Sequence, residues 1–305
     1  MQNGVFPAVR LIMDNGGMST QGYILKISCP DRPGIVHVVS HFLFGQTANI
    51  LDSAQFSDTF THRFFMRVHF AKTTQELNLA QLQAAFQEIG QTWEMDWELF
   101  DASSKPRVLI MVSKLGHCLN DLLFRTHSGY LPIEIAGIVS NHQDFAPLAK
   151  SYGIPFHYMP LSSATDSRKD TQEEQLLKLI ESERIDLVVL ARYMQILSTK
   201  VCEKLSGRAI NIHHSFLPSF KGAKPYWQAH QRGVKLIGAT AHYVTTDLDE
   251  GPIIEQGVER VDHSMDPEQL AAVGRDVECM ALSRAVRWHA EHRILLNGKS
   301  TVVFQ

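Results

Sequence analysis

Short, continuous apolar runs constrain the fold of the second half of the chain more than any other feature. Runs of this kind lie at 108–112, 133–139, 186–190 and 208–212. A strand that is buried on both faces has this pattern, because neither side of it meets water. Segments with helical periodicity lie between the runs, near 117–128, 143–152, 171–183 and 199–206. The alternation predicts an open, mostly parallel α/β sheet.

The first half of the chain has a different pattern. Strand-like segments at 23–29, 48–57, 61–71 and 93–100 are interrupted by helix-like segments at 34–45 and 75–89. The order is βαββαβ within about 80 residues, which is typical of a two-layer, ferredoxin-like sandwich.

The length of 305 residues fits two domains better than one. Small, polar and proline residues at 101–106 (DASSKP) indicate a linker. We therefore expect an N-terminal extension at 1–20, a first domain at 21–100 and a second at 107–305.

The second domain is predicted to end in two strands and a helix. The strands are expected at 235–244 and 252–260, and a long amphipathic helix at 267–294. One side of this helix carries the apolar side chains of Leu270, Val273, Val277, Met280, Ala281 and Trp288.

Charge and cysteine content exclude several classes of protein. The formal net charge of −3 argues against nucleic acid as a partner. No apolar run approaches the ~20 residues that span a bilayer, and residues 1–17 lack the features of a secretion signal. The four cysteines are far apart, which argues against a metal site or a disulfide scaffold. We therefore expect no membrane contact and a cytoplasmic protein.

Polar side chains gather where the strand at 208–212 ends. Asn211 and His213 are two residues apart, so on an extended chain they share a face, while His214 points to the other. Ligands of open α/β sheets bind beyond the carboxyl ends of the strands. Because adjacent histidines on opposite faces make a poor metal pair, this pattern favours acid–base chemistry.

Two further loops can reach this strand end. Asp249 lies 36 residues after His213, which leaves room for one helix and one returning strand. The strand at 186–190 runs into a mixed loop in which Tyr193 and Met194 suit the wall of a pocket for a flat ligand.

These motifs resemble known families. The segments Asn211-Ile-His213-His-Ser-Phe-Leu-Pro218 and Leu248-Asp249-Glu-Gly-Pro252 are similar to the signature of the formyltransferase family, over about residues 107–295. The segment Asp31-Arg-Pro-Gly-Ile-Val36 within its βαββαβ unit resembles an ACT domain. The two in this order resemble the formyltetrahydrofolate deformylase family, as does a double histidine where transferases usually have His-Pro.

The resemblance implies a Rossmann-like formyltransferase fold and the hydrolysis of 10-formyltetrahydrofolate to formate and tetrahydrofolate. The reaction would balance one-carbon folate pools and supply formate for purine biosynthesis. No cofactor is implied, since the folate is the substrate. In the transferases a loop rich in small residues holds the phosphate of the amine acceptor; here the loop at 113–120 is bulkier, so water is the expected acceptor.

The resemblance also implies residue roles. Asn211 would donate to the oxyanion, His213 would donate a hydrogen bond or pass a proton to N10, and Asp249 would orient or deprotonate water. Thr240 would hold a bridging water. The expected substrate contacts are Arg192, Tyr193, Met194, Gln195, Ile196, Leu197, Val244 and Asp247. Lys221 and Lys224 could meet the folate tail, although solvated surface lysines are favoured.

ACT-like domains often bind amino acids between copies. The candidate effector contacts are Asp31, Arg32, Gly34, Asn49 and Ile50, and glycine or methionine are the candidate effectors. A dimerisation domain without a ligand fits equally well. In either case we expect a homodimer or homotetramer.

Alternatives remain open at this point. The chain could be a formyltransferase with a different amine acceptor, or a folate or amino-acid sensor without turnover. The histidine pairs His37/His41 and His289/His292 are expected on solvated faces, and His242 could be either a packed strand residue or a member of the site.

Overall fold

The computed structural model describes residues 22–72, 78–161, 168–217 and 225–305. The predicted N-terminal extension, the start of the helix expected at 75, and Lys221 and Lys224 lie outside these ranges. None of the helices within them has the length and apolar character needed to cross a membrane.

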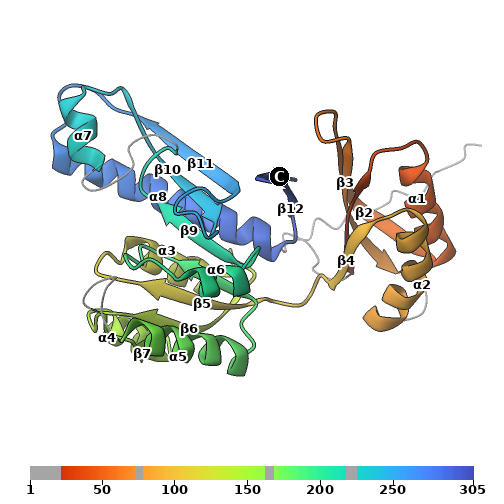
Figure 1. Ribbon diagram of the computed structural model, residues 1–305, viewed down its shortest axis with the longest axis horizontal. Helices are drawn as coiled ribbons and strands as arrows, with labels where there is room; N and C mark the ends of the chain where they lie inside the picture. Colours follow the sequence, from red (N-terminus) through yellow and green to blue (C-terminus); the bar gives the residue numbers. More distant parts are fainter. Residues whose placement is uncertain (1–21, 73–77, 162–167, 218–224) are drawn as a thin grey trace, which may run out of the picture.

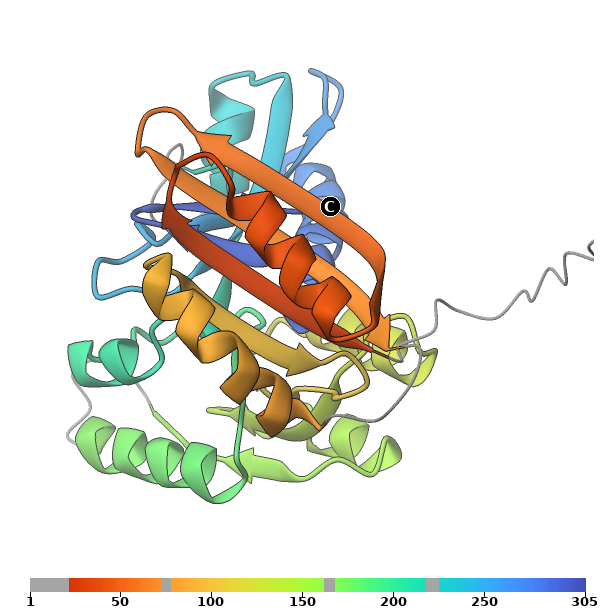
Figure 2. The same ribbon diagram turned by 90° about the vertical axis from the view of Figure 1, so that its right-hand side faces the viewer.

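The first sheet is antiparallel and has the strand order β2-β3-β1-β4. Its strands are β1 (Tyr23–Pro30), β2 (Ala48–Asp58), β3 (Arg63–Lys72) and β4 (Asp96–Asp101). Helices α1 (Ile35–Gly45) and α2 (Leu79–Thr92) cover one face (Figures 1 and 2). Side chains from both layers, including Leu25, Phe42 and Phe86, form one core. The predicted βαββαβ order is thus confirmed.

The second sheet has seven strands in the order β11-β10-β9-β8-β5-β6-β7. The strands β5 to β9 are parallel, whereas β10 and β11 are antiparallel. The bounds are β5 (Arg107–Val112), β6 (Glu134–Ser140), β7 (Phe156–Tyr158), β8 (Leu187–Leu190), β9 (Ala209–His213), β10 (Leu236–Tyr243) and β11 (Ile253–Arg260). The mostly parallel sheet predicted from the apolar runs is confirmed; the short strand β7 was not predicted.

Helices surround this sheet. They are α3 (His117–His127), α4 (Ala146–Ser151), α5 (Lys169–Ser182), α6 (Thr199–Lys204), α7 (Pro225–Gln231) and α8 (Pro267–Ala290). Helix α8 contacts β9, β10 and β11 and also packs against α3 and α7. It therefore packs against the same part of the sheet as β9, whose carboxyl end carries the predicted site residues.

The prediction for α8 is correct at its start and wrong at its end. A capping box begins the helix, because the Asp266 carboxylate accepts from the backbone N–H groups of Glu268 and Gln269. The helix ends at Ala290 rather than at 294, and a hairpin follows, formed by β12 (Ile294–Asn297) and β13 (Ser300–Val303). Met280 is 43% exposed, so it does not share the buried side of the helix.

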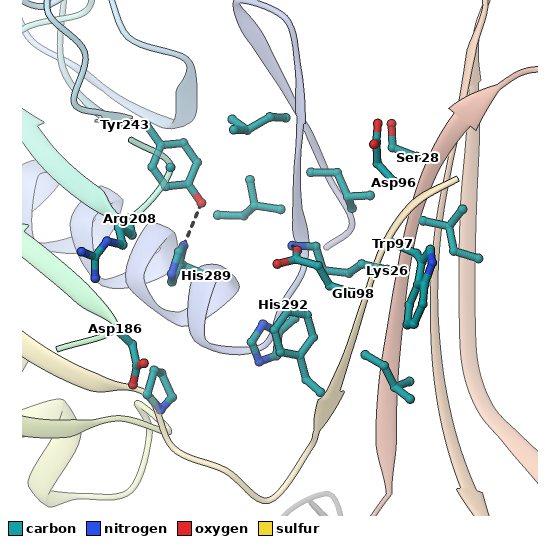
Figure 3. Close-up of a pocket in the computed structure, with 18 of the residues that line it drawn as sticks. Lys26, Ser28, Asp96, Trp97, Glu98, Asp186, Arg208, Tyr243, His289 and His292 are labelled. Atoms are coloured by element: carbon teal, nitrogen blue, oxygen red, sulfur yellow. Dashed lines mark hydrogen bonds and ion pairs between the residues drawn. The ribbon is translucent and has the colours of Figure 1, made fainter. Parts of the chain in front are cut away.

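The two sheets meet near the end of α8. The Arg67 Nη2 atom donates to the Glu291 carbonyl at 3.0 Å, and Asn297 donates to Asp58 at 2.6 Å. Phe100 stacks on His292 with ring centroids 3.6 Å apart. A cavity of about 1090 Å³ lies beside these contacts (Figure 3).

The expectation of a solvated face was wrong for His289 and His292. Both histidines line this cavity, and the Tyr243 hydroxyl lies 2.8 Å from His289 Nδ1. The two residues follow an amphipathic pattern that gives no sign of the first sheet packing against them. His37 and His41, in contrast, are exposed on α1 as expected.

Candidate active site

The end of β9 places two polar side chains beside β10. Asn211 and His213 lie opposite His242 and Thr240 in the antiparallel register. His213 is only 6% exposed. The expectation that His214 points away from His213 was wrong, because the two rings stack with centroids 5.0 Å apart and both line one cavity. The carboxyl end of β9 thus carries the polar groups that the sequence predicted there.

Asp249 reaches this strand end from the loop that joins β10 and β11. Its Oδ2 atom lies 3.3 Å from His213 Nδ1, and its Oδ1 atom lies 3.7 Å from His242 Nε2. Asp249 has a φ of 57°, an uncommon backbone conformation for a residue other than glycine. A side chain at Gly251 would overlap the Tyr243 carbonyl oxygen, so close packing of the loop on β10 requires glycine there.

The charge state of Asp249 follows from opposing effects. Burial raises the pKa of its carboxyl group, but the hydrogen bond from His213 and the charge of that ring lower it more strongly. The net effect holds the pKa well below its usual range. Asp249 is therefore an anion at neutral pH, able to accept protons or hydrogen bonds but not to donate them.

His242 belongs to this cluster, which decides the alternative that the sequence left open. Its Nδ1 atom lies 2.9 Å from the Tyr243 carbonyl, which can only accept, so Nδ1 carries a proton. In the neutral ring, Nε2 then accepts from Asn211 Nδ2 at 3.2 Å. This contact fixes the amide orientation of Asn211.

These residues line one cavity of about 280 Å³. All eight predicted substrate contacts also line it: Arg192, Tyr193, Met194, Gln195, Ile196, Leu197, Val244 and Asp247. Met194 and Ile196 are 58% and 50% exposed, which suits apolar walls that a ligand covers. The sequence therefore located the cavity walls, while their contact with a folate stays a prediction.

The structure does not bring Thr240 into the cavity. Its hydroxyl accepts from the backbone N–H of Leu217 at 3.1 Å and donates to the Ser215 carbonyl at 3.0 Å. It also accepts from Gln256 at 3.1 Å. With its hydrogen-bonding capacity used in this way, Thr240 fixes the loop after His214 instead of holding a bridging water.

A second buried polar group lies beside the first and was missed by the sequence reasoning. We call it the Glu278 cluster; it consists of His117, Arg192, Tyr226 and Glu278. Glu278 Oε2 lies 2.7 Å from His117 Nε2 and 3.4 Å from Arg192 Nε, and Oε1 accepts from the Tyr226 hydroxyl at 2.8 Å. One signal was available: Glu278 follows Val277 on the buried side of α8, where a charge is unexpected.

The carboxylate of Glu278 is ionised although it is 1% exposed. Burial raises its pKa, but the hydrogen bond from His117 and the charge of Arg192 lower it to a net value below the ordinary one. A buried anion of this kind is stable only with such partners.

The ligand atoms of His117, Cys118 and Glu278 lie within 4.8 Å of one another, close enough to hold a metal ion. The arrangement fits a cation poorly. Both oxygens of Glu278 already have partners, and the Arg192 guanidinium supplies positive charge there. A hydrogen bond with Cys279 and burial also raise the pKa of the Cys118 thiol, which disfavours the thiolate that a metal binds.

Arg192 links the Glu278 cluster to the cavity. It has a φ of 65°, a conformation that costs a residue other than glycine about 1–2 kcal/mol. Its carbonyl accepts from the Ser113 N–H at 3.2 Å, and Ser113 Oγ in turn accepts from the Met194 N–H at 3.0 Å. These bonds turn the chain from β8 into the cavity wall.

Comparisons with known proteins agree with this site. Residues 106–286 match the family described as Formyl transferase. The formyltetrahydrofolate deformylase of Corynebacterium sp. (strain P-1) is 52% identical over 283 residues, which cover 93% of this chain and 98% of the relative. The chain belongs to the formyltetrahydrofolate deformylase family.

Solved structures support the same assignment. The formyltetrahydrofolate deformylase of Burkholderia mallei is 54% identical, with a TM-score of 0.88 over 93% of this chain and 100% of that one. A glycinamide ribonucleotide transformylase from Symbiobacterium toebii is 28% identical, with a TM-score of 0.61 over 66% of this chain and 95% of that one. The deformylases thus match both sheets, whereas the transformylase matches about two thirds of the chain.

The loop after β5 packs closely against its neighbours, and its expected departure from the transferases stays a prediction. His117 begins α3 and its ring contacts Glu278, so a side chain of the protein lies at this helix start. A side chain at Gly116 would overlap the Phe145 ring, so the loop packs closely against its neighbour.

The predicted effector residues lie around the first sheet. Gly34 precedes α1 with a φ of 100°, and the Arg32 guanidinium lies 4.6 Å from the Trp93 ring centroid. Asp31 accepts from the Ser57 hydroxyl, and Asn49 and Ile50 are exposed near the start of β2. Binding of an effector there stays a prediction.

Proposed function

We propose that this chain hydrolyses 10-formyltetrahydrofolate to formate and tetrahydrofolate. The observation that carries the proposal is the meeting of Asn211, His213 and Asp249 at the end of β9, along one cavity. Deformylase relatives support it, including the Escherichia coli (strain K12) protein, which is 38% identical over 93% of this chain.

Asn211 would stabilise the oxyanion that forms when water attacks the formyl carbon. Its Nδ2 atom has two N–H groups, and His242 Nε2 accepts from one of them. The second is left for an oxygen in the cavity. A preorganised donor of this kind lowers the barrier by about 3–4 kcal/mol.

His213 and Asp249 would handle the protons. His213 Nδ1 faces the Asp249 carboxylate, and its Nε2 atom is buried without a hydrogen bond among the described residues. Asp249 orients the water and stabilises the cationic ring. As the C–N10 bond breaks, one proton of the attacking water reaches N10 through His213, and formic acid gives up the other to leave as formate.

We also propose where the reaction takes place and how the chain assembles. The chain needs no cofactor, acts in the cytoplasm, and supplies formate for purine biosynthesis. Its first sheet acts as an ACT-like unit that joins copies into a homodimer or homotetramer and responds to glycine or methionine. The exposed face of β2 and the residues around Arg32 are the surfaces available for this.

One experiment tests the central claim. The pure protein is incubated with 10-formyltetrahydrofolate alone, and formate is measured. We expect formate release without any amine, and almost none from the Asp249→Asn variant. Formyl transfer that requires an added amine would favour a transferase, and tight folate binding without turnover would favour a sensor.

The regulatory part is tested with the same assay. Glycine or methionine is titrated into the reaction of the wild-type chain and of Arg32→Ala. The proposal expects a change of rate that the substitution removes. An identical response of both chains would contradict effector binding at this position.

A further inference from the structure

Arg192 has unused hydrogen-bonding capacity in the interior of the protein. The residue is 8% exposed, and its Nε and Nη1 atoms have no hydrogen-bond partner among the residues that the structure describes. Buried donors are normally satisfied, so an unmatched pair of them calls for an explanation. Because these nitrogens are closed off from bulk water, any partner has to be small and enclosed.

Glu278 does not satisfy this arginine. It forms an ion pair with Arg192 Nε at 3.4 Å but makes its shorter contacts with His117 and Tyr226. Those two partners also reduce the repulsion that Glu278 would exert on another anion. The guanidinium therefore keeps donors for a second acceptor.

A third unpartnered nitrogen belongs to another residue of the same cavity. His213 Nε2 is buried without a hydrogen bond in the described part of the chain, and His213 and Arg192 line the same cavity. His214 lies close to both: burial, the charge of Arg192 and that of His213 lower its pKa to about 4. It is thus neutral near pH 7, and it neither competes for an anion nor adds a charge.

The backbone at Arg192 points to a use for the side chain. Its φ of 65° suits glycine, which would adopt this turn without strain. The chain instead places a large cation there, against the local preference of the backbone. Strain of this kind is commonly found at sites that bind or react.

We propose that Arg192 and His213 form a subsite for the carboxylate of the one-carbon product, formate. The inference rests on the proposed function, because it is the hydrolysis that generates this anion. Arg192 Nη1 has no hydrogen-bond partner among the described residues and can donate a charge-assisted hydrogen bond to one oxygen of a carboxylate. Two acids face the subsite: Glu278, whose oxygens contact His117, Tyr226 and Arg192, and Asp249, which contacts His213 and His242.

The subsite is tested by formate binding without turnover. Carbon-13-labelled formate is titrated into the full-length protein, and its NMR signal is followed for wild type, Arg192→Gly and Arg192→Lys. Glycine removes the guanidinium and relieves the backbone, so this variant is expected to fold. We expect formate affinity to fall about tenfold or more with glycine and less with lysine, which keeps the charge.

Arg184→Gly is the matched control. Arg184 also has a positive φ, of 50°, but it is exposed after α5 and lies outside the cavity. We expect its formate affinity to equal that of wild type. Circular dichroism spectra, measured on the same samples, should show that Arg192→Gly keeps the fold.

The outcomes separate the two proposals. No formate binding by wild type, or equal binding by wild type and Arg192→Gly, would overturn the subsite and leave a trapped water as the partner of Arg192. Formate binding that depends on Arg192, in a protein that releases no formate from 10-formyltetrahydrofolate, would keep the subsite and overturn the proposed hydrolysis. If Arg192→Gly does not fold, the formate affinity of Arg192→Lys is compared with that of wild type, and equal affinities would overturn the subsite.

Discussion

His242 and Tyr243 are neighbours on β10, but they point to opposite faces of the sheet and serve two polar regions. His242 contacts Asn211 and Asp249 at the candidate active site. Tyr243 contacts His289 beside the cavity between the two sheets (Figure 3). Both regions contain buried histidines, and within the described part of the chain a carboxylate contacts them only in the first.

The difference shows what a buried histidine needs for proton transfer. Burial and the nearby charge of Lys26 lower the pKa of His289 to about 4, and the same causes with further cationic neighbours lower that of His292 to about 3. Both rings are therefore neutral near pH 7 and act as packing groups. A carboxylate near a ring nitrogen can instead accept its N–H and fix the orientation of the ring, and Asp249 Oδ2 lies 3.3 Å from His213 Nδ1.

The largest effect on the rate is expected when the carboxylate of Asp249 is removed, because the buried histidines of both regions then lack a carboxylate partner. We expect Asp249→Asn to lower kcat for formate release at least about a hundredfold, because the water loses its acceptor and the cationic His213 its counter-ion. Steady-state kinetics with 10-formyltetrahydrofolate measure it, with circular dichroism as the control for folding. A variant with near-wild-type turnover would contradict the assigned site.

On the opposite face of β10, substitution of a buried histidine should change the stability of the protein and not its catalytic rate. With folded pKa values below the unfolded value, these rings contribute stability above about pH 6.5 that is lost as the pH falls toward 4. We expect His289→Phe to reduce the pH dependence of the free energy of unfolding by about 1.4 kcal/mol per pH unit in this window. Urea unfolding at several pH values measures it; an unchanged slope would show that His289 titrates normally.

His242 should behave as a positioning residue on the active-site face. We expect His242→Phe to lower kcat about tenfold, since Asn211 loses the acceptor that fixes its amide, with little change in KM. His242→Gln should recover part of the loss, because its amide can accept from Asn211 and donate to the Tyr243 carbonyl. Equal losses in both variants would point to packing alone.

The smallest effect is expected from Tyr243→Phe. This change removes only the hydroxyl that contacts His289, one hydrogen bond worth about 1 kcal/mol. Thermal unfolding should show a small decrease in Tm, while kcat stays within about twofold of wild type, since His242 still has its backbone partner. A large drop in kcat would mean that the two faces of β10 are not independent.

The local sequence pattern predicted the residues on the active-site face of β10 better than those on the face that meets His289. Asn211 and His213 share a face because strands have a period of two, and Asp249 follows a returning strand, so their meeting could be predicted. The surroundings of His289 and His292 depend on how the first sheet packs against the end of α8, which no local pattern records. The β12–β13 hairpin was missed because the helical pattern appeared to continue to 294.

The Glu278 cluster was hidden for a related reason. Its members come from the start of α3, the loop after β8, α7 and the middle of α8, four segments with no common motif. Thr240 shows the reverse case, since its motif position indicated a role in the site and its contacts show a structural one. Motif and spacing thus located residues on adjacent strands, but not a group assembled from four separate elements.

Helix α8 contributes to both regions. Glu278 lies in its middle, and His289 is eleven residues later, about 16 Å along the axis. A continuous helix is stiff along its length, so a displacement of one end also moves the other end. The first sheet contacts Glu291 and His292 just beyond that end. A movement of the first sheet would therefore displace α8, and with it Glu278 and its ion pair with Arg192.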